Sequence, residues 1–227
     1  MAKRDIYDAK MAQKRQAFLD AAFDLFSEKG IESVTLEAIA KKSGYGIATL
    51  YRHFTNKVNL VVELAAQKWE NYIASNNASV SADTIAAWTG AEYLRFYLDS
   101  FLDLYRNHKD MLRFNYELNS FLRKAEHDTE QMKSYSSMVE MLDVSFHELY
   151  ERGMKDGTLN KQNPEKTMFS STFHIMLAAV TRYAVGLVFV YQDAAEPEME
   201  LRMLANMMYR EFTVQSGESV NECVDRK

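Results

Sequence analysis

The chain has 227 residues, of which 47% are hydrophobic, and its formal net charge is −5. This length and apolar content support a sizeable core, so they exclude an intrinsically disordered chain. Only eight glycines and two prolines occur. Because such breakers are rare and apolar residues recur at helical spacing, we expect an all-α protein.

Two features favour a cytoplasmic protein. The single cysteine, Cys223, cannot form an intramolecular disulfide, and residues 1–10 lack the apolar core of a signal peptide. The stretch 173–191 is apolar and long enough to span a bilayer, but Arg182 lies near its middle. A charge there costs at least ~2.5 kcal/mol on insertion scales. We therefore expect a helix buried between subunits or domains and no membrane span.

Charge is unevenly distributed along the chain. Residues 1–60 carry ten Lys and Arg against seven Asp and Glu, whereas residues 61–227 carry 17 against 25. A basic N-terminal part on an acidic body is the asymmetry expected of a DNA-binding domain joined to a domain that does not touch DNA.

In chain order, residues 1–11 resemble a mobile arm, and the first helix is expected over 12–29, ended by Gly30. A short helix follows with Thr35 as its N-cap. A tight turn at 44–46 then leads to a third helix over 47–53. The fourth helix is expected from Lys57 to about Ile73.

A polar break is expected at 75–82, where the sequence is SNNASVSA. Loops are expected at 152–164 and 193–197, because glycine, asparagine and proline gather there. Between these breaks the apolar periodicity predicts five longer helices, over 83–106, 109–125, 129–154, 164–191 and 196–214.

Two short helices joined by a glycine-containing turn, after a longer helix, form the pattern of a helix-turn-helix. Its compact core is expected to contain Phe18, Ala22, Phe26, Ile39, Ala40, Leu50 and Phe54. Hydroxyls and cations suited to phosphate contacts flank the second short helix: Thr49, Tyr51, Arg52, His53 and Lys57.

Residues 34–60, VTLEAIAKKSGYGIATLYRHFTNKVNL, resemble the DNA-binding segment of the TetR family of transcriptional regulators. Residues 18–35 resemble the first helix of that family. The matching positions are Thr35, Ile39, Ala40, Gly44, Thr49, Leu50, Tyr51, His53, Phe54, Lys57 and Leu60.

The resemblance implies that five residues face the major groove, namely Tyr45, Gly46, Ile47, Ala48 and Thr49. It also implies phosphate contacts from Tyr51, His53 and Lys57, with Thr35 capping its helix and touching the DNA backbone. Arg52, beside them, is a further candidate for a phosphate contact. The sequence departs from the family at Gly46, where serine is usual, and at Ile47, often a cation. Glycine caps at a loss of a few tenths of a kcal/mol, so the helix is expected to form with one hydroxyl contact fewer.

Each of these residues also has a plainer interpretation. His53 is compatible with a packed histidine, and Tyr51 with surface packing alone. The cations Lys3, Arg4, Lys14 and Arg15 fit either a DNA-seeking arm or an exposed surface.

The remainder of the chain carries aromatic and methionine stripes. Taken singly these are core residues, but as a set they suit an adaptable cavity for an apolar ligand, which the resemblance also implies. The expected pocket residues are Tyr93, Phe96, Tyr97, Phe101, Phe114, Phe121, Met138, Met141 and Met176. Polar groups that could orient a ligand are Asn115, Glu117, Asn119 and Arg182.

Signs of catalysis are scarce. His147 and Glu151 form the one helical pair with metal-ligand spacing, which is usually ordinary helix surface. The sequence has no phosphate-binding glycine loop and no nucleophile elbow. We therefore expect no enzyme, no cofactor and no metal.

Together these features predict an N-terminal three-helix helix-turn-helix domain at 1–56 and a C-terminal helical bundle for ligand binding and dimerisation at 57–227. The resemblance implies a homodimer through the last two helices. It also implies a transcriptional regulator, expected to be a repressor, that is released from palindromic double-stranded operator DNA by a small apolar or amphipathic effector. Repression and activation are both compatible with the sequence. A helical protein-binding adaptor that has lost DNA binding and a small helical enzyme remain as alternatives.

Overall fold

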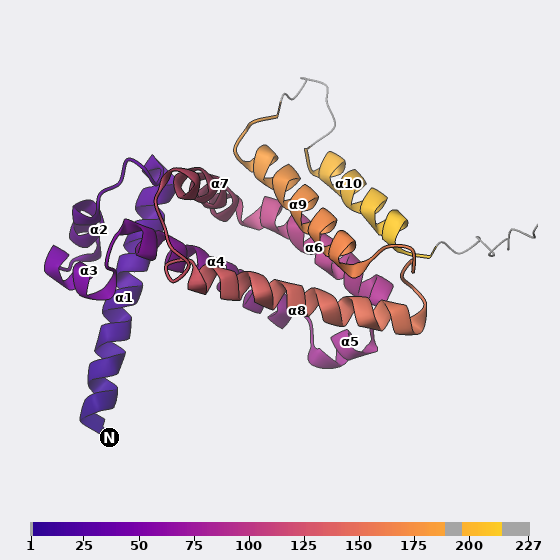
Figure 1. The fold of residues 1–227 in the computed structure, drawn as a ribbon, viewed down its shortest axis with the longest axis horizontal. Helices are drawn as coiled ribbons and strands as arrows, with labels where there is room; N and C mark the ends of the chain where they lie inside the picture. The colour runs from indigo at the N-terminus through magenta and orange to yellow at the C-terminus, as the bar shows by residue number, and fades with distance from the viewer. Residues whose placement is uncertain (1, 189–196, 215–227) are drawn as a thin grey trace, which may run out of the picture. The chain divides into compact units, whose positions relative to one another are not determined.

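The structure is a computed structural model that describes residues 2–188 and 197–214 (Figure 1). Within these ranges the regular structure is α-helical, apart from one isolated antiparallel bridge between Leu159 and Thr213. This confirms the all-α prediction. The helices are α1 (Ala2–Lys29), α2 (Leu36–Ser43), α3 (Ile47–His53), α4 (Lys57–Ala78), α5 (Ala82–Ala87), α6 (Gly90–Asn107), α7 (Lys109–Lys124), α8 (Lys133–Asp156), α9 (Glu165–Ala184) and α10 (Pro197–Phe212).

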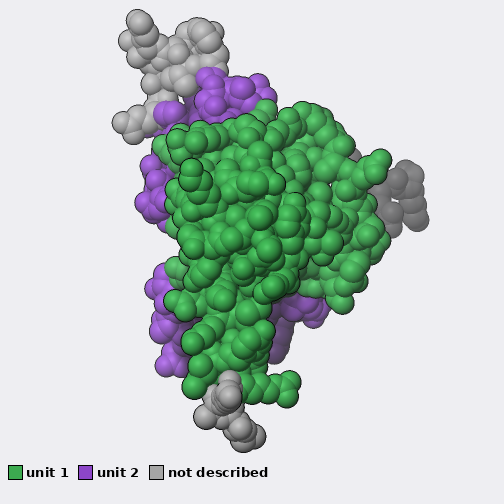
Figure 2. Space-filling view, turned by 90° about the vertical axis from the view of Figure 1, so that its left-hand side faces the viewer, with its two compact units in different colours: residues 1–77, 108–141 green, residues 78–107, 142–227 purple. Residues whose placement is uncertain are grey.

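The chain forms two compact units, which Figure 2 colours separately. Unit 1 contains residues 1–77 and 108–141, and unit 2 contains residues 78–107 and 142–227. Unit 1 thus adds α7 and most of α4 to the helix-turn-helix. The predicted functional boundary after residue 56 stays a prediction.

The expected mobile arm at 1–11 is wrong, because α1 begins at Ala2. Residues 4–10 are exposed on every side, so this extension owes its helix to local propensity and not to packing. Neither glycine nor proline occurs between Ala2 and Lys29 to end the helix earlier.

The expected helix over 83–106 is interrupted at Trp88 and Thr89, which separate α5 from α6. The hydroxyl of Thr89 accepts from the Glu92 amide at 3.2 Å, and the Glu92 carboxylate accepts from the Thr89 amide at 2.7 Å. This reciprocal capping box begins α6. Its sequence signal is a threonine followed three residues later by a glutamate.

The bounds of three other helices also differ from expectation. Helix α4 continues into the expected polar break at 75–82 and ends at Ala78, and α8 begins at Lys133, later than predicted. The expected helix over 164–191 ends at Ala184, shortly before Gly186 with its positive φ of 74°. Residues 189–191 of that prediction lie outside the described residues. No helix in the described ranges combines the length and hydropathy needed to cross a membrane.

The core of unit 1 forms around α1, α2 and α3. All seven predicted core residues are buried, with at most 3% of any of them exposed. Leu60 and Leu64 of α4 and Phe114 and Leu118 of α7 join the same cluster. Helix α3, the second helix of the helix-turn-helix, packs against α1 and α2, and this packing fixes the face that it turns outward.

In unit 2, α6 approaches α8 backbone to backbone. A Cβ atom at Gly90 would lie 2.1 Å from the Cα atom of Gly153. The amide of Gly90 donates to the Asp156 carboxylate at 2.7 Å, and the amide of Ala91 donates to the Thr158 hydroxyl at 3.0 Å. These acceptors satisfy two of the otherwise unpaired amides in the first turn of α6.

Candidate nucleic-acid interface

Helices α2 and α3 are joined by the tight turn that the sequence predicts. The hydroxyl of Thr35 accepts from the Ala38 amide at 3.2 Å and begins α2. Gly44 ends it with φ 78°, a conformation that side chains disfavour, and the Tyr45 amide then donates to the Ala40 carbonyl at 3.2 Å. Gly46 caps α3 through its carbonyl, which accepts from the Thr49 amide at 2.9 Å.

Side chains of α3 divide into an inner and an outer face. Leu50 is fully buried, whereas Ala48, Tyr51 and Arg52 are exposed. Tyr45 and Ile47 are partly buried against the core, and Thr49 is half-buried. Half of the Tyr51 surface is accessible, so its side chain is available to a partner.

His53 has the environment of a packed histidine. Its ring lies 5.8 Å from the ring of Phe18 and 6.3 Å from that of Phe54. Its Nε2 atom is buried with no hydrogen-bond partner among the described residues. Burial, and then the charges of Arg15 and Lys14, lower the pKa of His53, which keeps its imidazole neutral. Its phosphate contact stays a prediction.

Lys57 begins α4 with its ammonium already engaged. The Nζ atom donates to the backbone carbonyl of Glu32 at 3.2 Å and lies 5.6 Å from the centre of the Phe121 ring. Burial lowers the pKa of Lys57, while Glu32 opposes this shift. A phosphate contact therefore requires this ammonium to leave or share the carbonyl.

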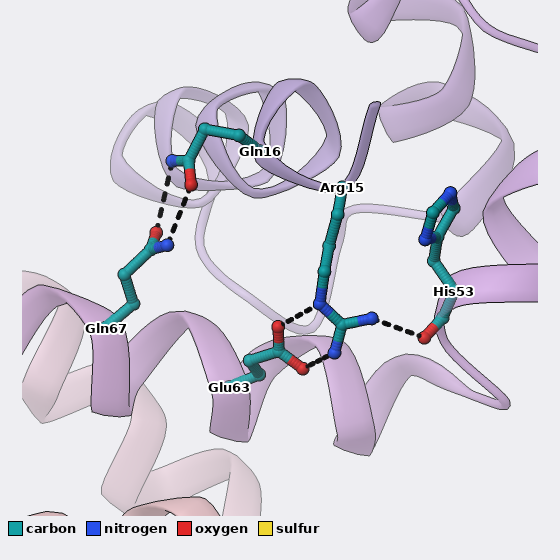
Figure 3. A network of polar contacts seen from close by, with 5 residues as sticks. All are labelled: Arg15, Gln16, His53, Glu63 and Gln67. Atoms are coloured by element: carbon teal, nitrogen blue, oxygen red, sulfur yellow. Dashed lines mark hydrogen bonds and ion pairs between the residues drawn. The ribbon is translucent and has the colours of Figure 1, made fainter. Parts of the chain in front are cut away.

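Figure 3 shows a polar network that joins α1, α3 and α4. The guanidinium of Arg15 pairs with both carboxylate oxygens of Glu63, and its Nη1 atom donates to the His53 carbonyl at 3.0 Å. The same guanidinium lies 4.6 Å from the centre of the Phe54 ring. Arg15 thus ties the last residue of α3 to α4. The sequence offered Arg15 only as a surface or arm cation, because both partners lie far along the chain.

A second polar pair bridges α1 and α4 in the same view. The side-chain amide of Gln67 donates to the oxygen of Gln16 at 2.7 Å, and that of Gln16 donates back at 3.2 Å (Figure 3). This pair is neutral, exposed and without a bond to α3, so it joins α1 to α4 alone.

The helix-turn-helix and its supporting helices also match known proteins. The sequence profile of the family described as "Bacterial regulatory proteins, tetR family" matches residues 18–64. Residues 18–64 are thus similar to the DNA-binding segment of TetR-family regulators.

Curated relatives match this chain over its N-terminal part. The HTH-type transcriptional repressor KstR of Rhodococcus jostii (strain RHA1) is 33% identical over 70 residues, which are 31% of this chain and 33% of that protein. An HTH-type transcriptional regulator of Staphylococcus aureus (strain USA300) is 45% identical over 53 residues, 23% of this chain and 28% of the relative. The match thus spans a third or less of the length of these relatives.

Solved structures extend the likeness to most of the chain. A TetR transcription regulator from Haloarcula marismortui superposes with a TM-score of 0.68 at 18% identity, covering 89% of this chain and all of that one. The transcriptional regulator FadR from Bacillus subtilis, in complex with stearoyl-CoA, gives 0.65 at 16% identity, covering 86% and 98%. At such identities the likeness shows the TetR-family fold, a helix-turn-helix followed by a helical bundle.

Of the residues expected in a TetR-family ligand pocket, four lie in unit 1. Phe114 stacks on Phe26 at 6.3 Å within the buried cluster, and Phe121 packs against that cluster. Met138 is buried, whereas 43% of Met141 is exposed. Their predicted pocket role is untested, and the two phenylalanines also support the helix-turn-helix.

The other five expected pocket residues lie in unit 2. Tyr93 and Phe96 are half-buried beside Trp88, at 5.8 and 5.1 Å between ring centres. Phe101 and Met176 are buried, and the hydroxyl oxygen of Tyr97 is buried as well.

Of the candidate orienting groups, Asn115 is buried in unit 1, and its Oδ1 atom has no partner among the described residues. Glu117 is half-buried, while Asn119 and Arg182 are exposed.

Proposed function

We propose that this chain is a ligand-responsive transcriptional regulator. It acts in the cytoplasm, binds palindromic operator DNA as a homodimer, and is released by a small apolar or amphipathic effector. The observation that carries the proposal is the α2–turn–α3 unit, whose outer face is exposed on a rigid core. The proposed DNA-contacting residues are Thr35, Tyr45, Gly46, Ile47, Ala48, Thr49, Tyr51, Arg52, His53 and Lys57.

The groove-facing residues favour A·T-rich half-sites. Ile47 and Ala48 have no hydrogen-bonding side chain, so they sense the thymine methyl and the shape of the groove. Arg52 is the nearby side chain able to grip guanine by two bonds, yet its position next to Tyr51 favours phosphate. We therefore expect thymine methyls opposite Ile47, and replacing those thymines by uracil should cost on the order of 1 kcal/mol per half-site.

An exposed apolar stripe on α10 supports the homodimer. Met199, Met203 and Met207 recur every four residues and are each exposed by 58–63%. With Arg202, Asn206 and Arg210 they line a shallow groove of about 340 Å³. On α9, Ile175 is exposed by 47%. Exposed apolar surface of this kind marks protein interfaces, and a dimer would place two recognition helices ~34–36 Å apart.

Release by a ligand follows the logic of linked equilibria. An effector that prefers a dimer with a different spacing of its recognition helices lowers DNA affinity by the ratio of its affinities for the two states. The stearoyl-CoA complex of FadR is a precedent for a ligand in this fold.

Selection of bound duplexes from a random pool tests the proposal directly. We expect a palindrome with A·T-rich half-sites. Tyr51→Ala should weaken binding to it. The control is Lys29→Ala, which removes an exposed cation at the end of α1 and should change the operator affinity by less than twofold. The absence of any sequence-selective binding would refute the proposal and leave the protein-binding adaptor. Selected half-sites centred on invariant G·C pairs and insensitive to uracil would refute the assignment of Ile47.

A further inference from the structure

The interior of unit 2 contains a closed ring of aromatic contacts, which we call the aromatic cluster. Its members are Tyr97 and Phe101 from α6, Phe146 from α8, and Phe169 and Phe173 from α9. Neighbouring ring centres around this circuit lie 5.3–6.3 Å apart. Three helices that are distant in sequence thus contribute to one apolar wall.

Two hydroxyl groups on the helices that form the aromatic cluster have no hydrogen-bond partner among the described residues. They are the Oη atom of Tyr97 and the Oγ1 atom of Thr172, and both atoms are buried. Thr172 follows Phe169 by three positions and precedes Phe173, so it lies on the face of α9 that carries both rings. A buried hydroxyl without a partner costs about 1–3 kcal/mol, so a ligand that supplies the missing bond gains that energy.

The charge around these hydroxyls restricts what such a ligand can be. Burial raises the pKa of Tyr97, and no charged side chain in the described part of the chain contributes to this shift. A carboxylate or phosphate placed there would lose its hydration without gaining a cation, which is strongly unfavourable. A neutral hydroxyl or carbonyl oxygen avoids this cost of burying an unpaired charge.

We propose that the aromatic cluster binds a neutral ligand with an apolar body and a hydroxyl or carbonyl oxygen, which Tyr97 hydrogen-bonds, with Thr172 as a second anchor. This inference rests on the proposed function and names the class of its effector. It separates this chain from a regulator that holds an acyl-CoA or a free fatty acid.

The cluster can be reached from the surface of unit 2. Phe169 and Phe173 are only half-buried, whereas Phe101 and Phe146 are buried. The two α9 rings therefore form the outer side of the cluster, where a rotation of side chains admits a ligand without unfolding a helix.

Calorimetric titration of the full chain with three ten-carbon probes tests the proposal. The probes are 1-decanol, 2-decanone and decanoate at pH 7.5, which share an apolar body and differ in the oxygen group. We expect the alcohol and the ketone to bind at least tenfold more tightly than the carboxylate. Failure of both neutral probes to bind, or decanoate binding as tightly as either, would overturn the proposal.

Tyr97→Phe removes only the hydroxyl. It should weaken binding of the neutral probes about five- to tenfold while the melting temperature of the unliganded protein stays equal or rises. The control is Tyr209→Phe, whose ring packs under Arg95 at 4.0 Å outside the cluster and which should change neither quantity. A lower melting temperature with unchanged affinity would show a purely structural hydroxyl and overturn the proposal. Should Tyr97→Phe fail to fold, Thr172→Val decides by the same affinity criterion.

The result is separable from that of the proposed function. Probe binding with no effect on operator binding would retain the neutral-ligand site and refute ligand release. Operator binding without binding of either neutral probe would retain the proposed DNA binding and refute the neutral-ligand site.

Discussion

Replacing Glu63 by Gln should weaken operator binding although it removes a negative charge from the proposed DNA-binding unit. The guanidinium of Arg15 donates to the His53 carbonyl at the end of α3, and it is held in place by both carboxylate oxygens of Glu63. Glutamine keeps the size of the side chain and one acceptor but loses the bidentate ion pair. Arg15 should then hold the end of α3 less firmly.

The expected magnitude follows from exposure. The side chains of Arg15 and Glu63 are 39% and 28% exposed, so solvent screens the pair and its worth falls well below that of a buried one. About 1 kcal/mol remains for a bidentate pair of this kind, which corresponds to roughly fivefold in affinity. Loss of one negative charge by itself would strengthen binding to any duplex, so a fivefold loss cannot arise from charge.

Fluorescence anisotropy with the selected operator and with a scrambled duplex measures both effects. We expect a roughly fivefold loss on the operator and no loss on the scrambled duplex for Glu63→Gln. Arg15→Lys keeps the positive charge but cannot pair with both carboxylate oxygens as a guanidinium does, so it should lower the operator affinity by a similar factor. Gln67→Ala breaks the neutral pair between the same two helices and should stay within twofold. Operator affinity that is unchanged or higher in Glu63→Gln would refute the positioning role of Arg15.

Three further outcomes are expected. Lys57→Ala should lower affinity for all duplexes alike and reduce the slope of log affinity against log salt by about one unit, whereas an unchanged slope would leave its ammonium on the Glu32 carbonyl. Met203→Glu should give monomers in sedimentation that stay folded by circular dichroism, because this residue is 58% exposed in one chain; a stable dimer would place the interface elsewhere. Because the pKa of His53 is lowered in the folded state, the unfolded chain binds its proton more readily, and stability should fall as pH drops below about 6.5. Urea unfolding at pH 7.5 and 5.5 should show a smaller loss of unfolding free energy for His53→Gln than for the unsubstituted protein. An equal loss would refute the assignment of this pH dependence to His53.

The helix-turn-helix was predictable because its signals are local. Thr35, Gly44 and the apolar residues of α1 to α3 lie within a short stretch, and each specifies a cap, a turn or a buried face. The end of α9 before Gly186 was not predicted, because apolar residues continue on both sides of this glycine and the sequence pattern does not change there. The extension of α1 was missed because residues 4–10 have no apolar face, the feature on which the prediction of a helix relied.

Side-chain networks were less predictable than helices. The ring contact between Tyr97 and Phe146 and the pair of Arg15 with Glu63 join residues far apart in sequence, and residue type alone cannot pair them. The aromatic stripes did indicate Tyr97 and Phe101. Phe169, Phe173 and Thr172 lay inside a stretch interpreted as a subunit contact, so their role in the cluster emerged only from the fold.

The crossing of α6 and α8 limits how this sequence can vary. Gly153 lies between Gly90 and Leu159, and a methyl group on Gly153 would come within 2.2 Å of the Leu159 side chain. An alanine at Gly90 would require α6 and α8 to separate, and one at Gly153 would require the Leu159 side chain to move. No change at residue 153 can make room for a side chain at residue 90, since Gly153 already has the smallest side chain. Any side chain at Gly90 is thus excluded while α6 and α8 keep this close approach. Sequence change in unit 2 is therefore expected to accumulate away from this contact between α6 and α8.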